Sequence, residues 1–253
     1  MKGVGYWILK NIASTDIGFK HLLKCNTKDL AEHLKNAGCK SAKQLAENWA
    51  MSQTDLWKQS VKFYREELQS KNINVIHFKQ NIFPQSLREI PDPPRWLFVQ
   101  GDLSVLHKPS IAIVGTRNPS EDGKFLAHYV GKSLFQFNDI VTVSGLANGI
   151  DQIIHRQSIR FNVPTVAFIG TGILLNYPNG SEELRQEIIT NGGAIISEYL
   201  PNQVFAPKRD KLKTEVKTLT IPPEIYNYLK KAKNEAELDG LRDKIVFHRK
   251  FWV

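Results

Sequence analysis

The feature that most constrains the fold is a regular alternation of apolar runs and amphipathic segments between residues 109 and 200. The segments at 121–137, 149–162 and 181–191 have apolar positions at helical spacing, which indicates helices. Between them, continuous apolar runs predict buried strands at Ser110–Gly115, Asp139–Ser144, Thr165–Gly170 and Ala194–Ser197. Continuous apolar strands separated by helices are typical of a parallel sheet covered on both faces. The sequence therefore predicts an α/β fold with a Rossmann-like parallel sheet.

The flanking segments have a different pattern. Residues 1–70 predict a bundle of short helices, because leucines and aromatic residues recur at helical spacing, and Thr27 and Ser41 are the expected N-caps of two of them. Four prolines predict an extended lead-in, with short strands at Ile73–Ile76 and Leu97–Val99. The chain is thereby divided into a small helical domain at 1–70, the lead-in at 71–108, the Rossmann-like core at 109–200 and a divergent basic segment at 201–253.

Composition excludes several classes of protein. With 42% hydrophobic and 23% charged residues, the chain of 253 residues can bury a core, which excludes an intrinsically disordered protein, a collagen-like fibre and a disulfide-stapled mini-protein. The net charge of +9 comes from the flanks. Residues 1–100 have 15 Lys and Arg against 9 Asp and Glu, residues 200–253 have 12 against 7, and the segment between has 7 against 9. This surplus fits a nucleic-acid partner, and fits a lysine-rich solvated surface equally well.

Cysteine content and hydropathy indicate the cellular compartment expected for the chain. Cys25 and Cys39 lie too far apart for a CxxC pair and have no matching His or Cys cluster in the sequence, so neither a zinc site nor a disulfide framework is expected. The N-terminal residues are too polar for a signal peptide, and no apolar run approaches the roughly 20 residues of a membrane span. The expectation is a cytoplasmic protein with no membrane partner, no metal and no cofactor.

Glycine-rich loops follow the predicted strands. The first strand runs into Gly115-Thr116-Arg117, the second into the loop 144–151, the third into 170–172 and the fourth into Ser197-Glu198. In an open parallel sheet, ligands bind at the carboxyl ends of the strands, where glycines let backbone N–H groups approach an anion and helices direct their positive ends. Arginine has the planar set of donors that suits a phosphate. Three such loops in register, with an arginine on the first, favour an anion-binding cleft over ordinary tight turns.

Known nucleotide fingerprints are absent. The chain has neither GxGxxG after the first strand nor GxxxxGK[ST], which excludes the dinucleotide and P-loop signatures. Asp151 fits a general base, but near a helix start it fits better as an acceptor for backbone N–H groups. His155 lies one turn later, so an acid/base pair with Asp151 is open, with a structural Asp–His hydrogen bond favoured. Glu198 has no evident carboxylate partner, which gives a two-carboxylate hydrolase weak support.

These motifs, in this order, resemble one family. IAIVGTR, SGLANGID with a histidine four residues on, GTG, YP and ISEY are similar to motifs of the DNA-processing protein A (DprA, or Smf) family. The preceding FPQSLREIPDPPRWLFVQGDL is similar to that family's lead-in, and the helical start resembles its SAM-like domain. The resemblance covers roughly residues 1–207. Beyond Asp210 the chain does not resemble the family, which indicates a shortened or replaced C-terminal part, so Ala194–Ser197 is expected to lack a neighbouring strand unless the tail covers it.

The resemblance implies a non-enzymatic protein that binds single-stranded DNA, protects incoming strands and helps to load the RecA recombinase during natural transformation. A RecA-type recombinase and a second copy of the chain are therefore further candidate partners. The phosphate cleft and the basic residues after the fourth strand supply the candidate DNA- or phosphate-binding residues. These are Gly115, Thr116, Arg117, Ser144, Gly145, Ala147, Gly149, Asp151, Gly170, Gly172, Lys208 and Arg209.

Two alternatives to DNA binding stay open at this point. The same cleft suits a nucleotide-binding sensor or a nucleotide hydrolase of the same Rossmann-like superfamily, although the PGGxGTxxE signature of the nucleoside-monophosphate phosphoribohydrolases is missing. A degenerate chain without an independent function is the other alternative. The apolar tail with Phe247, Phe251 and Trp252 argues mildly against it, because a random out-of-frame end less often supplies such a segment.

Overall fold

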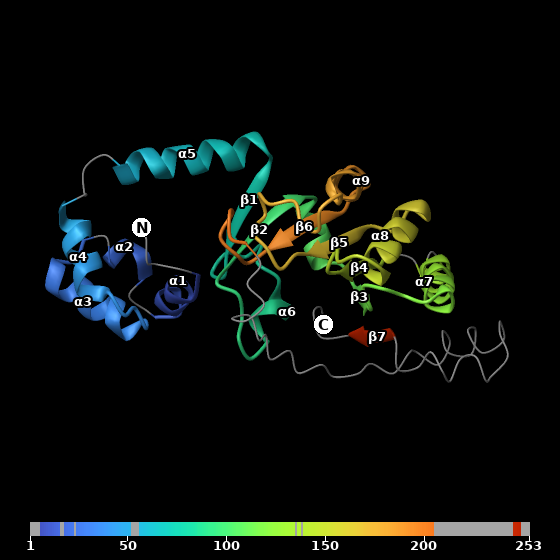
Figure 1. Ribbon diagram of the computed structural model, residues 1–253, viewed down its shortest axis with the longest axis horizontal. Helices are drawn as coiled ribbons and strands as arrows, with labels where there is room; N and C mark the ends of the chain where they lie inside the picture. The colour runs from blue at the N-terminus through green and yellow to red at the C-terminus, as the bar shows by residue number, and fades with distance from the viewer. Residues whose placement is uncertain are drawn as a thin grey trace.

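The N-terminal part of the chain is helical. The computed structural model describes residues 6–15, 18–22, 24–51, 56–134, 136–137, 139–204 and 245–248. Before the first strand lie α1 (Tyr6–Ala13), α2 (Gly18–Leu22), α3 (Thr27–Asn36), α4 (Ala42–Met51) and α5 (Leu56–Ser70) (Figure 1). Buried side chains that include Leu30, Leu34 and Leu45 form a core among helices α1 to α4. Among the described residues we find no helix with the length and hydropathy required to cross a lipid bilayer.

The N-cap residues of two N-terminal helices were predicted from the sequence with different accuracy. The side-chain oxygen of Asn26 accepts the Asp29 N–H at 2.9 Å, so Asn26 is the N-cap of α3. The prediction of Thr27 is therefore wrong by one residue, because Thr27 is already helical. Ser41 lies directly before α4, and its carbonyl accepts the Leu45 N–H at 3.0 Å.

A mixed sheet forms the centre of the molecule, in the order β1-β2-β6-β5-β4-β3-β7. Its parallel part consists of β3 (Ser110–Gly115), β4 (Val141–Ser144), β5 (Thr165–Phe168) and β6 (Ala194–Ser197). Strands β3 and β6 have the predicted bounds, whereas β4 begins two residues later and β5 ends two residues earlier than predicted. The Rossmann-like parallel sheet predicted from the alternating pattern is confirmed.

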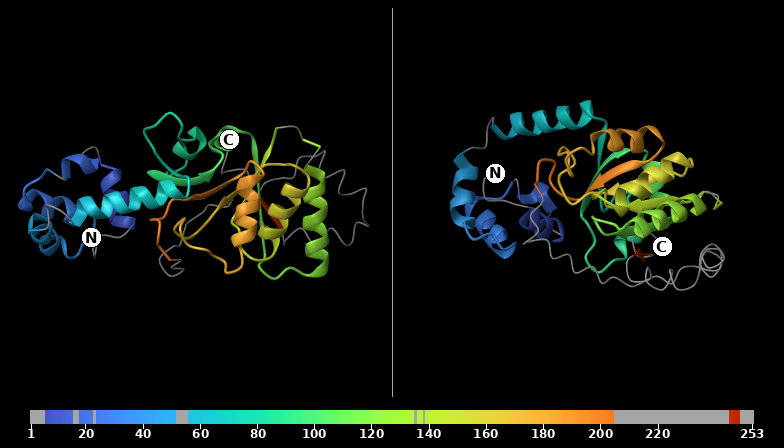
Figure 2. Two further views of the ribbon diagram at one scale, coloured as in Figure 1. Left: turned by 90° about the horizontal axis from the view of Figure 1, so that it is seen from above. Right: turned by 45° about the vertical axis from the view of Figure 1, so that its right-hand side comes forward.

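The connecting helices all lie on one face of the sheet. They are α7 (Glu121–Leu134), α8 (Ile150–Arg160) and α9 (Glu182–Thr190), which stand side by side in Figure 2. Each crossover steps to the next strand in the same direction, and right-handed crossovers then place every helix on the same side. On the opposite face the cover comes from α6 (Gln85–Arg88) and the 3₁₀ helix η1 (Leu103–His107), whose buried Leu87 and Leu106 join the strand side chains.

The lead-in contributes strands to this sheet. β1 (Ile73–His77) pairs antiparallel with β2 (Trp96–Gly101), and β2 pairs antiparallel with β6, with Phe98 opposite Ser197. The expectation that Ala194–Ser197 lacks a neighbour unless the tail covers it is wrong, because β2 occupies that position. The tail strand β7 (Ile245–His248) pairs antiparallel with β3 at the opposite edge.

Helix α1 is attached to the sheet by polar and aromatic contacts. The Tyr6 hydroxyl donates to Glu198 Oε2 at 2.5 Å, and Lys10 Nζ lies 2.9 Å from Asp92 Oδ2. The Tyr6 ring meets Trp96 edge-on and is tilted against Tyr199. Burial, together with the Glu198 carboxylate, raises the pKa of Tyr6 above its usual range, so the hydroxyl keeps its proton. Glu198 therefore acts as a structural acceptor at the end of β6.

A buried polar network joins α8 to the sheet. His155 Nδ1 lies 2.7 Å from Thr165 Oγ1, which accepts from Thr142 Oγ1 at 2.7 Å, and Thr142 also contacts Ser158. The Nε2 atom of His155 is buried with no hydrogen-bond partner among the described residues. The favoured Asp151–His155 hydrogen bond is wrong, because His155 points at β5 whereas Asp151 points at the loops before α8. His155 is thus a core residue.

Acid is expected to destabilise the protein through His155. Burial lowers the pKa of this ring to about 3, from its ordinary value of 6.5. As the pH falls through 6.5, His155 is protonated in the unfolded chain but stays neutral in the folded protein. The stability present at neutral pH is therefore lost between pH 6.5 and about 3. Going from pH 7 to pH 5 costs about 2 kcal/mol through this group. Urea denaturation at the two pH values measures the loss.

The substitution His155→Asn isolates this contribution. Asparagine does not titrate in this range and can retain a polar contact with Thr165, so the variant is expected to be less stable at pH 7 but to lose less stability at pH 5. His128→Asn, at an exposed position on α7, is the matched control and should keep the wild-type pH dependence. Equal pH dependence in wild type and His155→Asn would contradict the assignment.

Candidate functional site

The loops at the carboxyl ends of β3 and β4 are joined to each other. The Ile150 N–H donates to the Thr116 carbonyl at 3.2 Å, which ties the start of α8 to the loop after β3. The carboxylate of Asp151, the second residue of α8, accepts from the N–H groups of Gly145 at 3.1 Å and of Gly115 and Ala147 at 3.4 Å. Asp151 therefore does accept from backbone N–H groups, as predicted, but these belong to the preceding loops.

The state of the Asp151 carboxyl reflects two opposing influences. Its burial raises the pKa of the group, while the backbone N–H donors act in the opposite direction. The net shift is upward. Both carboxylate oxygens are engaged by backbone groups, and a buried carboxylate repels phosphate. We therefore assign Asp151 to holding the two loops together.

The glycines of these loops are required by contacts within the protein. Gly149 has φ +87°, and a Cβ there would lie 2.4 Å from the Thr116 carbonyl oxygen and 2.6 Å from that of Arg117. A Cβ on Gly115 would lie 2.7 Å from Ile150 Cγ1. These distances are too short for any side chain, so Gly149 lies directly against the backbone of the loop after β3, and Gly115 lies directly against the Ile150 side chain. The sequence interpretation attributed the glycines to the approach of an anion, whereas packing of one loop on the other already requires them.

A hollow of about 440 Å³ lies where α7 and α8 begin. The loop after β3 contributes Arg117, Asn118 and Pro119, and α7 contributes Lys124. Gly149 forms part of the wall beside the start of α8. From α8 come Gln152, Ile153 and Arg156. The hollow thus combines three cationic side chains with backbone at the N-terminus of a helix, which is a favourable setting for an anion.

The three cations differ in how far they are already neutralised. Lys124 Nζ lies 2.6 Å from Glu121 Oε1, and Arg156 Nη1 lies 3.7 Å from Glu187 Oε2. The exposed Arg117 guanidinium has no hydrogen-bond or ion-pair partner within the described part of the chain. Its donors are therefore available, and a guanidinium can bind two oxygens of one phosphate at once.

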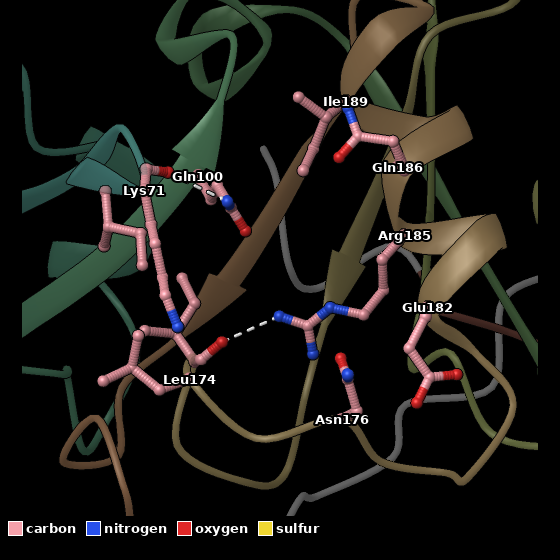
Figure 3. Close-up of a pocket in the computed structure, with 10 residues that line it drawn as sticks. Lys71, Gln100, Leu174, Asn176, Glu182, Arg185, Gln186 and Ile189 are labelled. Atoms are coloured by element: carbon pink, nitrogen blue, oxygen red, sulfur yellow. Dashed lines mark hydrogen bonds between the residues drawn. The ribbon is translucent and has the colours of Figure 1, made fainter. Parts of the chain in front are cut away.

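The loop after β5 packs against the chain that follows β6. The Gly172 N–H donates to the Gln203 carbonyl at 2.7 Å, and a Cβ on Gly172 would lie 2.2 Å from the Leu200 carbonyl oxygen. The buried Arg185 guanidinium donates to the carbonyls of Leu175 at 2.7 Å and Ile173 at 2.8 Å. Figure 3 shows this arginine in a second hollow, also lined by Lys71, Gln100 and Glu182. Since its donors face loop carbonyls, Arg185 holds the loop in shape.

The remaining candidate residues lie at several places along this edge of the sheet. The buried Ser144 hydroxyl donates to the Ile113 carbonyl at 2.6 Å, and Thr116 Oγ1 accepts the Asn118 N–H at 3.2 Å. Gly170 is exposed at the start of the loop after β5. Lys208 and Arg209 lie outside the described residues. The structure thus brings Arg117 and Gly149 to the hollow, and a phosphate-binding role for any of the candidate residues stays a prediction.

Sequence reasoning missed the helical side chains of the hollow. Lys124 lies in the first turn of α7, and Gln152 and Arg156 are four residues apart on α8, so they share one face of that helix. That spacing, together with the position near both helix starts, was a signal available in the sequence.

Taken together, the four parallel strands and the basic hollow at their carboxyl ends define a Rossmann-like α/β protein with a candidate anion site. Residues 74–212, more than half of the chain, match the family model for DNA recombination-mediator protein A. The chain belongs to this family, DprA.

Individual relatives agree with this assignment. The X-ray structure of DNA processing protein A from Streptococcus pneumoniae is similar, with a TM-score of 0.56 and 27% identity over 82% of this chain and 72% of that chain. The curated DprA of Streptococcus pneumoniae is 39% identical over 121 residues, which is 48% of this chain and 42% of that protein. The curated DprA of Bacillus subtilis is 35% identical over 139 residues, 54% of this chain and 45% of that protein. The chain thus matches less than half the length of these two curated relatives.

Proposed function

We propose that this protein binds single-stranded DNA with little regard to base sequence and acts as a recombination mediator in DNA uptake, without catalysis. The observation that carries the proposal is Arg117, an exposed arginine with no partner among the described residues, at the mouth of a basic hollow. Membership of the DNA recombination-mediator family supports the same function. In this proposal the protein works in the cytoplasm during natural transformation and delivers the strand to a RecA-type recombinase, and a second copy of the chain is a further candidate partner.

The geometry favours contacts to the phosphate backbone. Arg117, Lys124 and Arg156 surround the hollow, and their donors recognise phosphate oxygens whichever base is attached. Neutralising phosphates releases counterions from the strand, so the affinity should fall as salt is added. With three such contacts, the dissociation constant is expected to rise about 10- to 20-fold between 50 and 200 mM salt.

Fluorescence anisotropy of a labelled oligo-dT across a salt series tests the proposal. Arg117→Glu is expected to raise the dissociation constant at least tenfold at low salt, because one attractive contact becomes repulsive, and to lower the salt slope by about 0.7. The matched control is Arg160→Glu, which makes the same charge change in the last residue of α8, about 15 Å along the helix from its start. Absence of binding by the folded wild type at low salt, or an equal loss in both variants, would overturn the proposal.

A nucleotide-binding sensor is the second candidate function. The hollow of about 440 Å³ has the size of a small-molecule site, and its cations suit a nucleotide phosphate. Competition distinguishes the two candidates. A mononucleotide that displaces the oligonucleotide at similar concentration favours the sensor, whereas DNA binding that resists mononucleotides favours the mediator.

A further inference from the structure

Three metal-ligating side chains converge in the N-terminal helices, away from the basic hollow. They are His21 on α2, Cys25 in the turn that follows, and His33 on α3. One ligand atom from each lies within 4.8 Å of the other two. The two imidazole rings are 6.3 Å apart at 76°, so they meet edge to face. Such an arrangement allows one nitrogen of each ring to point at a common centre.

The local fold explains why these residues meet. The Cys25 N–H donates to the Leu22 carbonyl at 3.3 Å, which closes the turn after α2, and the Asn26 cap then starts α3 in a new direction. Two of the ligands have a buried leucine as their chain neighbour, Leu22 beside His21 and Leu34 beside His33. Because both leucines belong to the same apolar core, core packing sets the distance between the helices that carry the ligands.

The chemistry of the three groups identifies the class of ion. One thiolate and two imidazoles are ligands typical of zinc, whereas magnesium and calcium prefer oxygen. In a tetrahedral zinc site, bonds of about 2.3 Å to sulfur and 2.0–2.1 Å to nitrogen place the ligand atoms roughly 3.3–3.6 Å apart. The side chains must therefore close by about 1 Å, which small χ rotations supply. His21 is exposed and the other two are half-buried, so an ion can enter from solvent.

We propose that His21, Cys25 and His33 bind one Zn²⁺ ion, with water in the fourth position. On binding, the Cys25 thiol releases its proton to solvent, and each imidazole binds through an unprotonated nitrogen. The ion ties the end of α2 to α3 and so stabilises the helical segment. The sequence analysis expected no ligands to match Cys25, because it tested only for cysteine pairs and local clusters. It did not take account of His33, eight residues further along the chain. This site is independent of the proposed DNA binding.

Cobalt titration of the full chain tests the site directly. The reduced, metal-free protein is titrated with Co²⁺, and Zn²⁺ is then added as a competitor. The wild type is expected to give a thiolate-to-cobalt charge-transfer band and the visible bands of a tetrahedral site, saturating at one equivalent and abolished by Zn²⁺. Cys25→Ser is expected to lose the charge-transfer band, and His21→Gln and His33→Gln to weaken Co²⁺ binding at least tenfold.

Controls separate the site from nonspecific binding and from misfolding. Cys39→Ala removes the other cysteine, which is buried in the same core, and should keep the wild-type cobalt spectrum. Circular dichroism of each metal-free variant checks folding, and the exposed His21 is the position least able to disturb it. Zn²⁺ should raise the melting temperature of the wild type and of Cys39→Ala, but not that of Cys25→Ser. Absence of the band in folded wild type, or its survival in Cys25→Ser, would overturn the proposal.

Discussion

Replacing Gly149 by alanine is expected to lower the free energy of unfolding by about 3–5 kcal/mol. The residue has φ +87° and ψ −128°, a combination that costs an L-residue about 1–3 kcal/mol. The new Cβ would also lie 2.4 Å from the Thr116 carbonyl oxygen, and backbone cannot yield as a flexible side chain can. Urea denaturation followed by circular dichroism gives the loss directly. Oligonucleotide binding should fall as well, because the overlap pushes apart the loops that form the basic hollow.

Two other glycines provide controls for Gly149→Ala. Gly180 has φ +81° but open space around its Cβ position. Gly180→Ala therefore measures backbone strain without steric overlap, and is expected to lower the free energy of unfolding by about 1–2 kcal/mol. Gly123 lies within α7 at ordinary contact distance from its neighbours, and Gly123→Ala should be neutral or stabilising by up to about 1 kcal/mol. If Gly149→Ala proves as stable as Gly180→Ala, the loops separate easily, which would contradict the close packing of Gly149 on the loop after β3.

Asp151→Ala is expected to destabilise the protein by about 2–3 kcal/mol and to weaken DNA binding. The variant leaves the N–H groups of Gly115, Gly145 and Ala147 without their shared acceptor. Relief from burying the carboxylate offsets part of this loss, as the raised pKa of the group indicates. Urea denaturation measures the stability, and anisotropy with oligo-dT measures the binding. Weaker binding despite removal of a negative charge distinguishes a residue that holds the loops from one that repels phosphate.

Asp151→Asn and Asp122→Ala complete the comparison. Asparagine has one acceptor oxygen in place of two, so Asp151→Asn should lie between alanine and wild type in both measurements. Asp122 is exposed in the first turn of α7, and Asp122→Ala should change stability by less than about 1 kcal/mol. If Asp151→Ala binds oligo-dT more tightly than wild type, the loop-holding role is contradicted.

The parallel sheet was predictable because each strand between 110 and 197 is a continuous apolar run. Strand ends were less well predicted at Asp139, whose φ of +61° lies outside the strand region, and at Ile169-Gly170, where neutral sequence continues past Phe168, the last ladder residue of β5. The place of β2 beside β6 could not be predicted, since a short strand does not encode its partner and antiparallel neighbours are chosen by packing. Because the pairing of β2 was not predicted, Ala194–Ser197 was expected to lack a neighbouring strand.

For the candidate site, the sequence predicted the loops and Arg117 but not how the loops contact each other. Residues four apart on a helix were expected to interact, as Asp151 and His155. The rotation of α8 on the sheet prevents this contact, because Asp151 accepts hydrogen bonds from the loops and His155 is hydrogen-bonded to Thr165. The same rotation brings Arg156 to the hollow. Rotation of a helix about its axis follows from tertiary packing, which one periodic sequence pattern does not determine.

The attachment of α1 affects where this chain can be divided. By sequence, α1 belongs with the other N-terminal helices, but Tyr6 covers Trp96 and Tyr199 and satisfies Glu198 at the end of the sheet. A fragment that starts at the first strand would expose two aromatic rings and leave that carboxylate without its donor. Such a fragment would have a newly exposed aromatic surface and would be prone to self-association. The smallest unit that preserves the sheet in its native surroundings therefore includes Tyr6, sixty-seven residues before β1 begins.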